Sequence, residues 1–258
     1  MPMPAQWYTY LLALLAGIVA GVINTLAGSG SLITLPMLIF LGLPANVANA
    51  TNRVGVILQN VVGITAFHRG GKLHLAGVRW LVPPAVAGAV VGAFVAKSLK
   101  AEAMNTAIGV VMVLMLGVVL LNPERWLRSR SEVKPGRPGI GFLALFFGLG
   151  VYGGFIQAGV GVFLLAAMVL GLGYTLVDAN GIKLVIVLSF ALVSLAIFAS
   201  GGQVHWALGV LMACGQGVGA WLAARFAVKN KNANVWVRRL LIAVIVLSVL
   251  KLFGLLPL

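Results

Sequence analysis

Charged residues and cysteine are scarce in this sequence. Only 9% of its 258 residues are charged while 61% are hydrophobic, whereas water-soluble domains carry about 25% charged residues. A soluble protein is therefore excluded, and a membrane protein is expected. The single cysteine, Cys214, rules out an intramolecular disulfide and offers no paired thiols for a redox or metal site.

The few acidic residues also leave an enzyme without candidates for its chemistry. Glu102, Glu124 and Glu132 fall in loops, and Asp178 is the fourth acid. Paired intramembrane carboxylates, an HExxH motif and a GxSxG motif are all missing, so hydrolysis has no residues to perform it. We therefore expect no enzymatic activity and no cofactor.

Long apolar runs dominate what is present. Residues 103–121 and 240–258 approach the length of about 20 residues that a helix needs to cross a hydrocarbon core of about 30 Å. Runs such as 110–116 show no alternation of apolar and polar residues, which excludes barrel strands. The predicted fold class is all-α, a polytopic bundle of membrane helices embedded in the lipid bilayer.

Basic residues give the chain a net charge of +14, which in a soluble protein would suggest nucleic acid. Here most of them cluster in the segments 69–79, 125–137 and 225–239. Such clusters are typical of loops retained on the cytoplasmic side of a membrane. We therefore expect no nucleic-acid partner and place the protein in the cell inner membrane.

An internal repeat divides the chain. At an offset of 131 residues, Ala27-Gly28-x-Gly30 aligns with Ala158-Gly159-x-Gly161, and Ala48-Asn49 aligns with Ala179-Asn180, without a gap. We predict a first transmembrane repeat at 1–121, a cytoplasmic basic loop at 122–138 and a second transmembrane repeat at 139–258.

Each repeat should contain five apolar segments, of which the second is too short to cross the membrane. In the first repeat the segments are 8–28, 30–43, 47–68, 76–97 and 103–121. The short second segment indicates a broken or re-entrant helix pair, followed by three spans. That arrangement would give two inverted repeats, a construction found in many secondary transporters.

The two breaks provide the first set of candidate substrate-binding residues. Glycine lets the backbone approach a ligand closely, and the N–H groups at the start of a half-helix favour an anion. The alternative is that these glycines only permit close helix packing. The candidates are Asn24, Gly28, Ser29, Gly30 and Ser31 in the first repeat, and Gln157, Gly159 and Gly161 in the second.

A second polar cluster follows each break. Arg53 and Lys183 would supply positive charge to a bound anion, although snorkelling to the interface explains basic residues there equally well. His74 and His205 align under the same offset, but no carboxylate or thiol neighbours them in the sequence, so we predict no metal site. The candidate binding residues of this cluster are Asn49, Thr51, Asn52 and Arg53, with Asn180 and Lys183 in the second repeat.

These motifs resemble those of the sulfite exporter TauE/SafE family. Residues 20–38 are similar to the family signature AGxIDxxAGGGGLxTxPxL, residues 50–53 to its ATNK element, and residues 152–161 to its YDGFxGxGxG element. The resemblance covers nearly the whole chain and implies transport of sulfur-containing anions, such as sulfite, a sulfonate or a thiosulfate-like anion, or of organic acid anions. Where the family often has Asp, this chain has Asn24 and Gly153, which removes two carboxylates able to carry protons.

We expect the two repeats to carry a small anionic solute by alternating access. The solute would bind near the bilayer midplane, between the two breaks. Two alternatives stay open: a membrane scaffold or accessory subunit that transports nothing, and a carrier of cations or neutral solutes.

Overall fold

The computed structural model describes residues 7–27, 30–71, 73–75, 77–121, 138–227, 242–243, 245–250 and 252. All regular secondary structure among these residues is helical, which confirms the predicted class. The helices are α1 (Trp7–Ala27), α2 (Ser31–Phe40), α3 (Ala45–Arg69), α4 (Val78–Ser98), α5 (Ala101–Leu120), α7 (Ile140–Phe155), α8 (Val160–Ala166), the π-helix η1 (Ala167–Gly171), α9 (Leu176–Ala199) and α10 (Trp206–Ala227).

The helix boundaries follow local sequence signals. Gly159 has a φ of 73° directly before α8, a left-handed conformation that glycine adopts without a steric penalty. The hydroxyl of Thr175 accepts a hydrogen bond from the amide of Asp178, which caps the start of α9. The predicted apolar segments of the first repeat therefore become helices within a few residues of their expected bounds.

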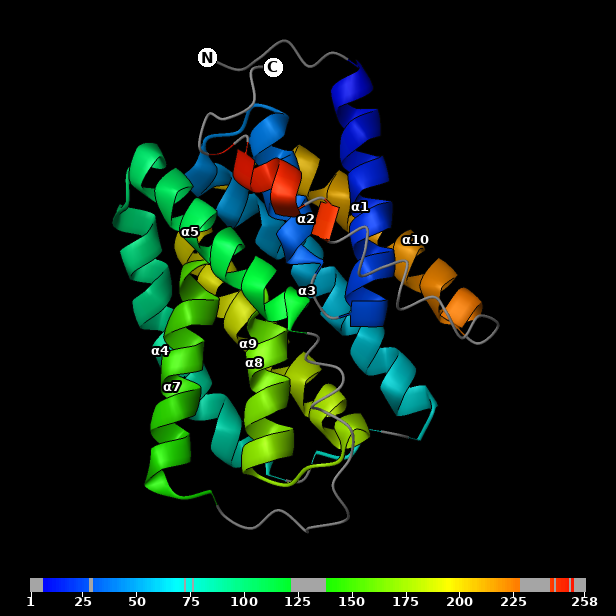
Figure 1. Ribbon diagram of the computed structural model, residues 1–258, viewed down its shortest axis with the longest axis vertical. Helices are drawn as coiled ribbons and strands as arrows, with labels where there is room; N and C mark the ends of the chain where they lie inside the picture. Colours follow the sequence, from blue (N-terminus) through cyan, green and yellow to red (C-terminus); the bar gives the residue numbers. More distant parts are fainter. Residues whose placement is uncertain are drawn as a thin grey trace.

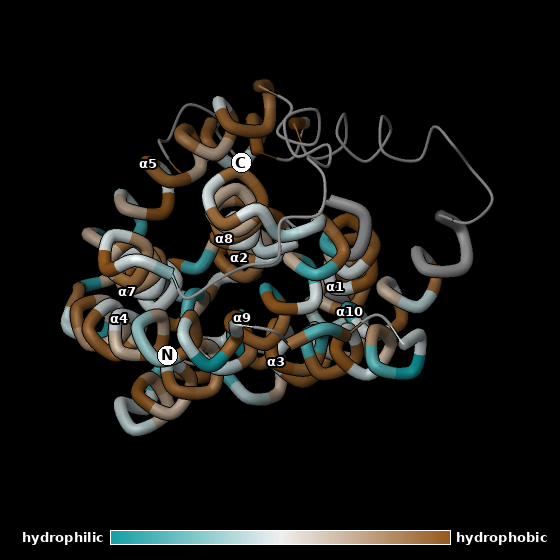
Figure 2. The backbone as a smooth tube through the Cα atoms, turned by 90° about the horizontal axis from the view of Figure 1, so that it is seen from below, coloured by the Kyte–Doolittle hydropathy of each residue, from teal (hydrophilic) through white to brown (hydrophobic). Residues whose placement is uncertain are grey.

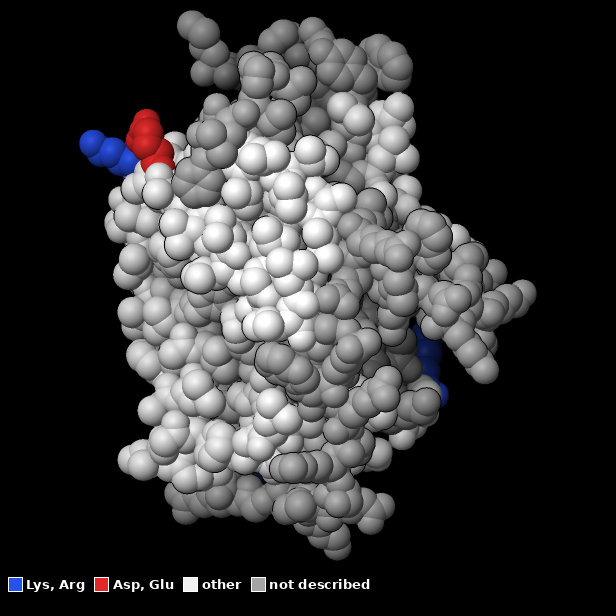
Figure 3. Space-filling model, in the orientation of Figure 1, with Lys and Arg blue, Asp and Glu red and all other residues white. Residues whose placement is uncertain are grey.

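The outer surface of the bundle is apolar, as contact with the hydrocarbon chains of lipids requires. Among the described residues, three helices are long and apolar enough to cross a membrane, namely α4, α5 and α9. Large apolar side chains such as Leu114, Phe94 and Leu192 are exposed, and the charged atoms of described residues visible in Figure 3 lie near the margins of that face. A soluble monomer rarely exposes so continuous an apolar surface.

Two closely packed helix pairs flank a central pair. α4 packs along α7 and α1 along α10, while α3 and α9 contact each other between them. Figure 2 shows the α4–α7 pair on one side, the α1–α10 pair on the other, and the short helices α2 and α8 next to the central pair. Apolar residues predominate along most of these helices in the same view.

The helix contacts repeat under the offset of 131 residues. This offset relates α1, α2, α3 and α4 to α7, α8, α9 and α10. The α1–α10 contact then corresponds to the α7–α4 contact, α3–α10 to α9–α4, and α2–α3 to α8–α9. The fourth helix of each half thus packs against the first helix of the other half. The predicted boundary at 122–138 falls almost entirely outside the described residues and stays a prediction.

Glycine lets the flanking pairs approach until their backbones touch. A Cβ atom built on Gly150 of α7 would lie 2.0 Å from the carbonyl oxygen of Ala85 in α4. On the other side, a Cβ on Gly219 of α10 would lie 2.0 Å from the carbonyl oxygen of Ile18 in α1. Gly150 and Gly219 therefore serve close helix packing, the alternative role that the sequence allowed for glycine, and both lie outside the two breaks.

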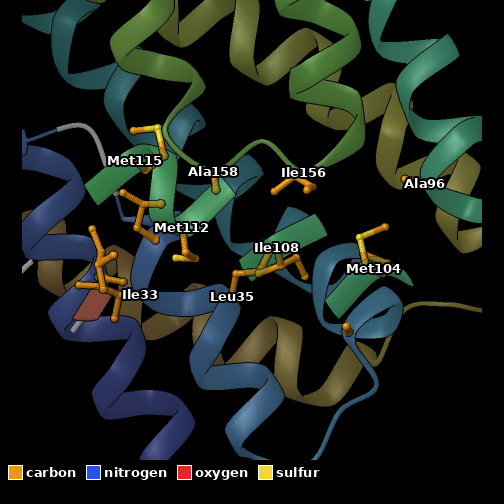
Figure 4. Close-up of a cluster of buried hydrophobic side chains, with 14 of the residues drawn as sticks. Ile33, Leu35, Ala96, Met104, Ile108, Met112, Met115, Ile156 and Ala158 are labelled. Carbon is orange, nitrogen blue, oxygen red and sulfur yellow. The ribbon is translucent and has the colours of Figure 1, made fainter. Parts of the chain in front are cut away.

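Helix α5 covers the central region with methionine and isoleucine side chains. Met112 and Ile108 pack in one buried cluster with Leu35 of α2 and with Ile156 and Ala158, which follow α7. Figure 4 shows these side chains converging from α2, α5 and the α7–α8 connection. Flexible methionine side chains fill this space, so the covering layer can adapt to small shifts of its neighbours.

Candidate functional site

Each break is the tip of a helical hairpin. At the first break, α1 ends at Ala27 and α2 begins at Ser31, and at the second, residues 156–159 connect α7 to α8. In Figure 1, α1 begins and α2 ends at the top of the molecule, whereas α7 begins and α8 ends at the bottom. The two hairpins therefore enter the bundle from opposite ends, and α1 contacts α2 as α7 contacts α8.

The two hairpin tips meet at one small cavity. Its volume is about 60 Å³. The cavity combines residues of α1 and α2 that flank the first break, residues of the second break and of α8, and residues of the central helices α3 and α9, so segments that are far apart in the sequence line it. The lining residues are Asn24, Ser31, Val56, Asn60, Gln157, Gly159, Val160, Gly161, Lys183, Leu184 and Val187.

Two carboxamides in the cavity wall are held by their oxygen atoms. Asn24 Oδ1 accepts a hydrogen bond from the backbone N–H of Gly30 at 3.1 Å, and Gln157 Oε1 accepts one from Arg53 at 2.5 Å. A carboxamide has one accepting and one donating end. Because both oxygen atoms are engaged, the amino groups are the ends left to a bound solute.

The remaining polar groups of the cavity also donate. Lys183 Nζ donates to Asn180 Oδ1 at 2.9 Å, which leaves further hydrogens on its ammonium group. Among the described residues, the amides of Gly159 and Gly161 donate to no backbone carbonyl, and the described lining contains no carboxylate. The cavity therefore offers a positive charge and several donors, which are the groups that bind an anion.

Arg53 lies beside the cavity and faces the end of α7. Its side chain is completely buried. One terminal nitrogen donates to the carbonyl of Gly153 at 2.6 Å as well as to Gln157, and the other donates to the carbonyl of Gly154 at 2.9 Å. The guanidinium also lies 5.5 Å from the ring centre of Phe198. Arg53 thus satisfies carbonyl groups that the end of a helix leaves without partners.

Asn49 reinforces this contact one turn earlier on α3, because its Nδ2 donates to the carbonyl of Phe155 at 2.7 Å. The second break is also held from within, since the hydroxyl of Tyr152 donates to the carbonyl of Ala158. Gln157 itself adopts a φ of 68°, and it is the one described residue other than glycine with a positive φ. The geometry of this tip is therefore fixed by several specific contacts.

Of the remaining candidate residues, two form hydrogen bonds between helices of the bundle and two lie outside the described residues. Asn52 Oδ1 accepts from the hydroxyl of Thr34 at 2.5 Å, which ties α3 to α2. The hydroxyl of Thr51 accepts from the amide of His205 at 2.9 Å, which ties α3 to the start of α10. Gly28 and Ser29 lie outside the described residues.

Of the fourteen candidates, the structure brings six to the cavity wall. Arg53, Gly30 and Asn180 each bond to one of these six. The six are Asn24, Ser31, Gln157, Gly159, Gly161 and Lys183.

Three features were absent from the candidate set. Asn60, which the sequence suggested either as an extension of the solute path or as a partner of a neighbouring helix, lines the cavity two turns beyond Arg53 on the same face of α3. Thr34 pairs with Asn52 across two helices. His74 Nδ1 lies 2.7 Å from the carboxylate of Asp178, although the two are far apart in the sequence. Within the described residues, no three metal-ligating side chains gather into one group.

Comparison with known proteins identifies the family. The model of the family described as sulfite exporter TauE/SafE matches residues 13–252. A probable membrane transporter protein of Haemophilus influenzae is 29% identical over 217 residues, which cover 83% of this chain and 84% of that protein. The probable membrane transporter protein YfcA of Escherichia coli K12 is 28% identical over 214 residues, covering 82% and 78%.

A third relative, the probable membrane transporter protein ORF9 of a Sinorhizobium species, is 26% identical over 243 residues, covering 93% of this chain and 92% of its own. No solved structure gives a significant match. The family match extends over nearly the whole chain, and the apolar helices are those of an integral membrane protein. The chain therefore belongs to the sulfite exporter TauE/SafE family, and its relatives are probable membrane transporters.

Proposed function

We propose that this protein is a secondary transporter of a small anion in the cell inner membrane, and that the anion binds in the cavity between the two hairpin tips. The observation that carries the proposal is the chemistry of the cavity wall. Lys183 contributes the charge, while Asn24 and Gln157 are both held by their oxygen atoms, and their amino groups have no hydrogen-bond partner among the described residues. A cation carrier would need the opposite arrangement, with oxygen atoms facing the solute.

The size of the cavity limits the solute. Its volume of about 60 Å³ is several times the roughly 10–15 Å³ of cavity that one water molecule requires. A small inorganic oxyanion or a short organic acid matches this space better than a bulky metabolite. The family description supports a sulfur oxyanion such as sulfite, and a small sulfonate is the next candidate.

Alternating access is supported by the two hairpins that enter from opposite ends of the bundle (Figure 1) and by the helix contacts that repeat under the 131-residue offset. Two inverted repeats of this kind can expose one central site to either side in turn. The described cavity wall holds no carboxylate, so the membrane potential, which acts directly on a moving anion, is the proposed driving force in place of proton binding.

Flux measurements on reconstituted protein test the proposal. Proteoliposomes should take up radiolabelled sulfite or a small sulfonate when an inside-positive potential is imposed, and Lys183→Met should abolish that uptake. Lys97→Met is the matched control, because Lys97 donates to Ser200 away from the cavity, and it should transport like the wild type. Uptake of a cation or a neutral solute in place of any anion would refute the proposal, and no uptake at all would favour the scaffold.

A further inference from the structure

We infer that Arg53 is a positioning residue, which turns the carboxamide of Gln157 so that its amino group faces the anion. This inference rests on the proposed function. It assigns to Arg53 a task different from direct contact with the solute. Arg53 would determine that the second hairpin tip binds an anion and not a cation, although Arg53 itself does not line the cavity.

Both terminal nitrogens of Arg53 donate hydrogen bonds to groups of the protein itself. They donate to the carbonyls of Gly153 and Gly154 and to Gln157 Oε1, at 2.6, 2.9 and 2.5 Å. Arg53 is fully buried and is not among the residues that line the cavity. A guanidinium is planar and rigid, so fixing it on two carbonyls also fixes the nitrogen that holds Gln157.

The orientation of Gln157 decides what the solute meets. A carboxamide turned by half a rotation would present its oxygen atom, which repels an anion, in place of its amino group. Arg53 cannot accept a hydrogen bond, so only the oxygen of Gln157 can face it. Arg53 thus excludes the wrong orientation, and the donor end is directed to the cavity that Gln157 lines.

The backbone of Gln157 points to a role for its side chain. Its φ of 68° lies in the left-handed region, where glycine is the relaxed choice and other residues are strained. Gly153 and Gly154 lie in the last turn of α7 and Gly159 lies in the break, so a glycine at position 157 would match the local sequence. A strained glutamine at a cavity wall is consistent with a side chain that touches the solute.

The transport kinetics of Arg53→Met and Asn49→Leu separate positioning from helix capping. Asn49 donates to the carbonyl of Phe155, so it caps the same helix end without touching Gln157. Asn49→Leu should lower the thermal stability, and any rise in the KM for radiolabelled sulfite should stay well below the rise caused by Arg53→Met, because Asn49 does not touch Gln157. Arg53→Met should raise that KM about tenfold or more, the size expected for one charge-assisted hydrogen bond. Equal KM changes in the two variants would overturn the inference.

A double substitution tests whether Arg53 acts through Gln157. In a Gln157→Leu background, Arg53→Met should cause no further rise in KM, because the group that it positions is gone. Additive effects would mean that Arg53 contacts the anion itself, and the inference would be wrong. Where Arg53→Met does not fold, Arg53→Lys supplies the test: it keeps a buried cation for the carbonyls and lacks the planar fork, so a KM equal to that of the wild type would overturn the inference. Wild-type protein that moves no anion would instead refute the proposed function.

Discussion

The glycine contact between α4 and α7 gives a quantitative prediction about stability. A Cβ atom on Gly150 would lie 2.0 Å from the carbonyl oxygen of Ala85 and 2.9 Å from its Cα. Gly148, on the same helix, has nothing within 4 Å of the equivalent position. Gly150→Ala and Gly148→Ala therefore make the same chemical change in the same helix, and only one of them meets an obstacle.

The expected magnitudes follow from the two surroundings. Replacing glycine by alanine inside a helix stabilises by about 0.5–1 kcal/mol, and Gly148→Ala should show this gain. At Gly150 the methyl group meets backbone atoms that cannot rotate away, and overpacking of this kind costs about 1–3 kcal/mol. Helices α4 and α7 would have to separate, so we expect a net loss of roughly 2 kcal/mol for Gly150→Ala.

Unfolding in detergent micelles measures this difference. The free energies of unfolding of the two variants should differ by about 3 kcal/mol, with opposite signs relative to the wild type. Both proteins should insert in membranes, because neither change alters the apolarity of α7. Similar stabilities for the two variants would show that α4 and α7 do not pack through these glycines, and the arrangement of the flanking helix pairs would have to be revised.

Two further substitutions test the break and the contact between α2 and α3. Gly30→Leu should abolish anion uptake while the protein stays folded and inserted, because a Cβ there would lie 2.6 Å from Cβ of Asn24 in the cavity wall; retained flux would contradict the site. Thr34→Val should lower the unfolding free energy by about 1–3 kcal/mol, since the buried Asn52 loses its hydroxyl partner. Thr106→Val is the control for thermal melting, because the Thr106 hydroxyl bonds its own helix in an exposed position, and an equal loss in both would refute the buried pairing.

Much of the fold was predictable because it depends on local properties of the chain. The apolar runs predicted the helices, and α5 occupies 101–120 where 103–121 was expected. The short segment beside each glycine pair predicted the hairpins, since helix length and glycine content are properties of a few neighbouring residues. The internal repeat pointed to equivalent elements, and the helix contacts follow the same offset.

The partners of polar side chains were harder to predict, because they depend on distant parts of the chain. Arg53 was expected to supply charge to a solute, yet its terminal nitrogens bond to residues about one hundred positions later. Asp178 lies beside His74 only because α9 begins next to the α3–α4 loop. Both pairings join the two halves, and a repeat found in the sequence does not say which residues of one half meet which residues of the other.

The sequence by itself determined that this chain forms apolar helices suited to a membrane and that glycines interrupt these helices at two places. Hydropathy and backbone freedom are properties of individual residues, so they can be read without the fold. Only the tertiary structure decided which of two basic residues faces the cavity. Lys183 lines it and Arg53 does not. The reason is that a buried cation must find partners, and the end of α7 offers carbonyl groups to the nitrogens of Arg53.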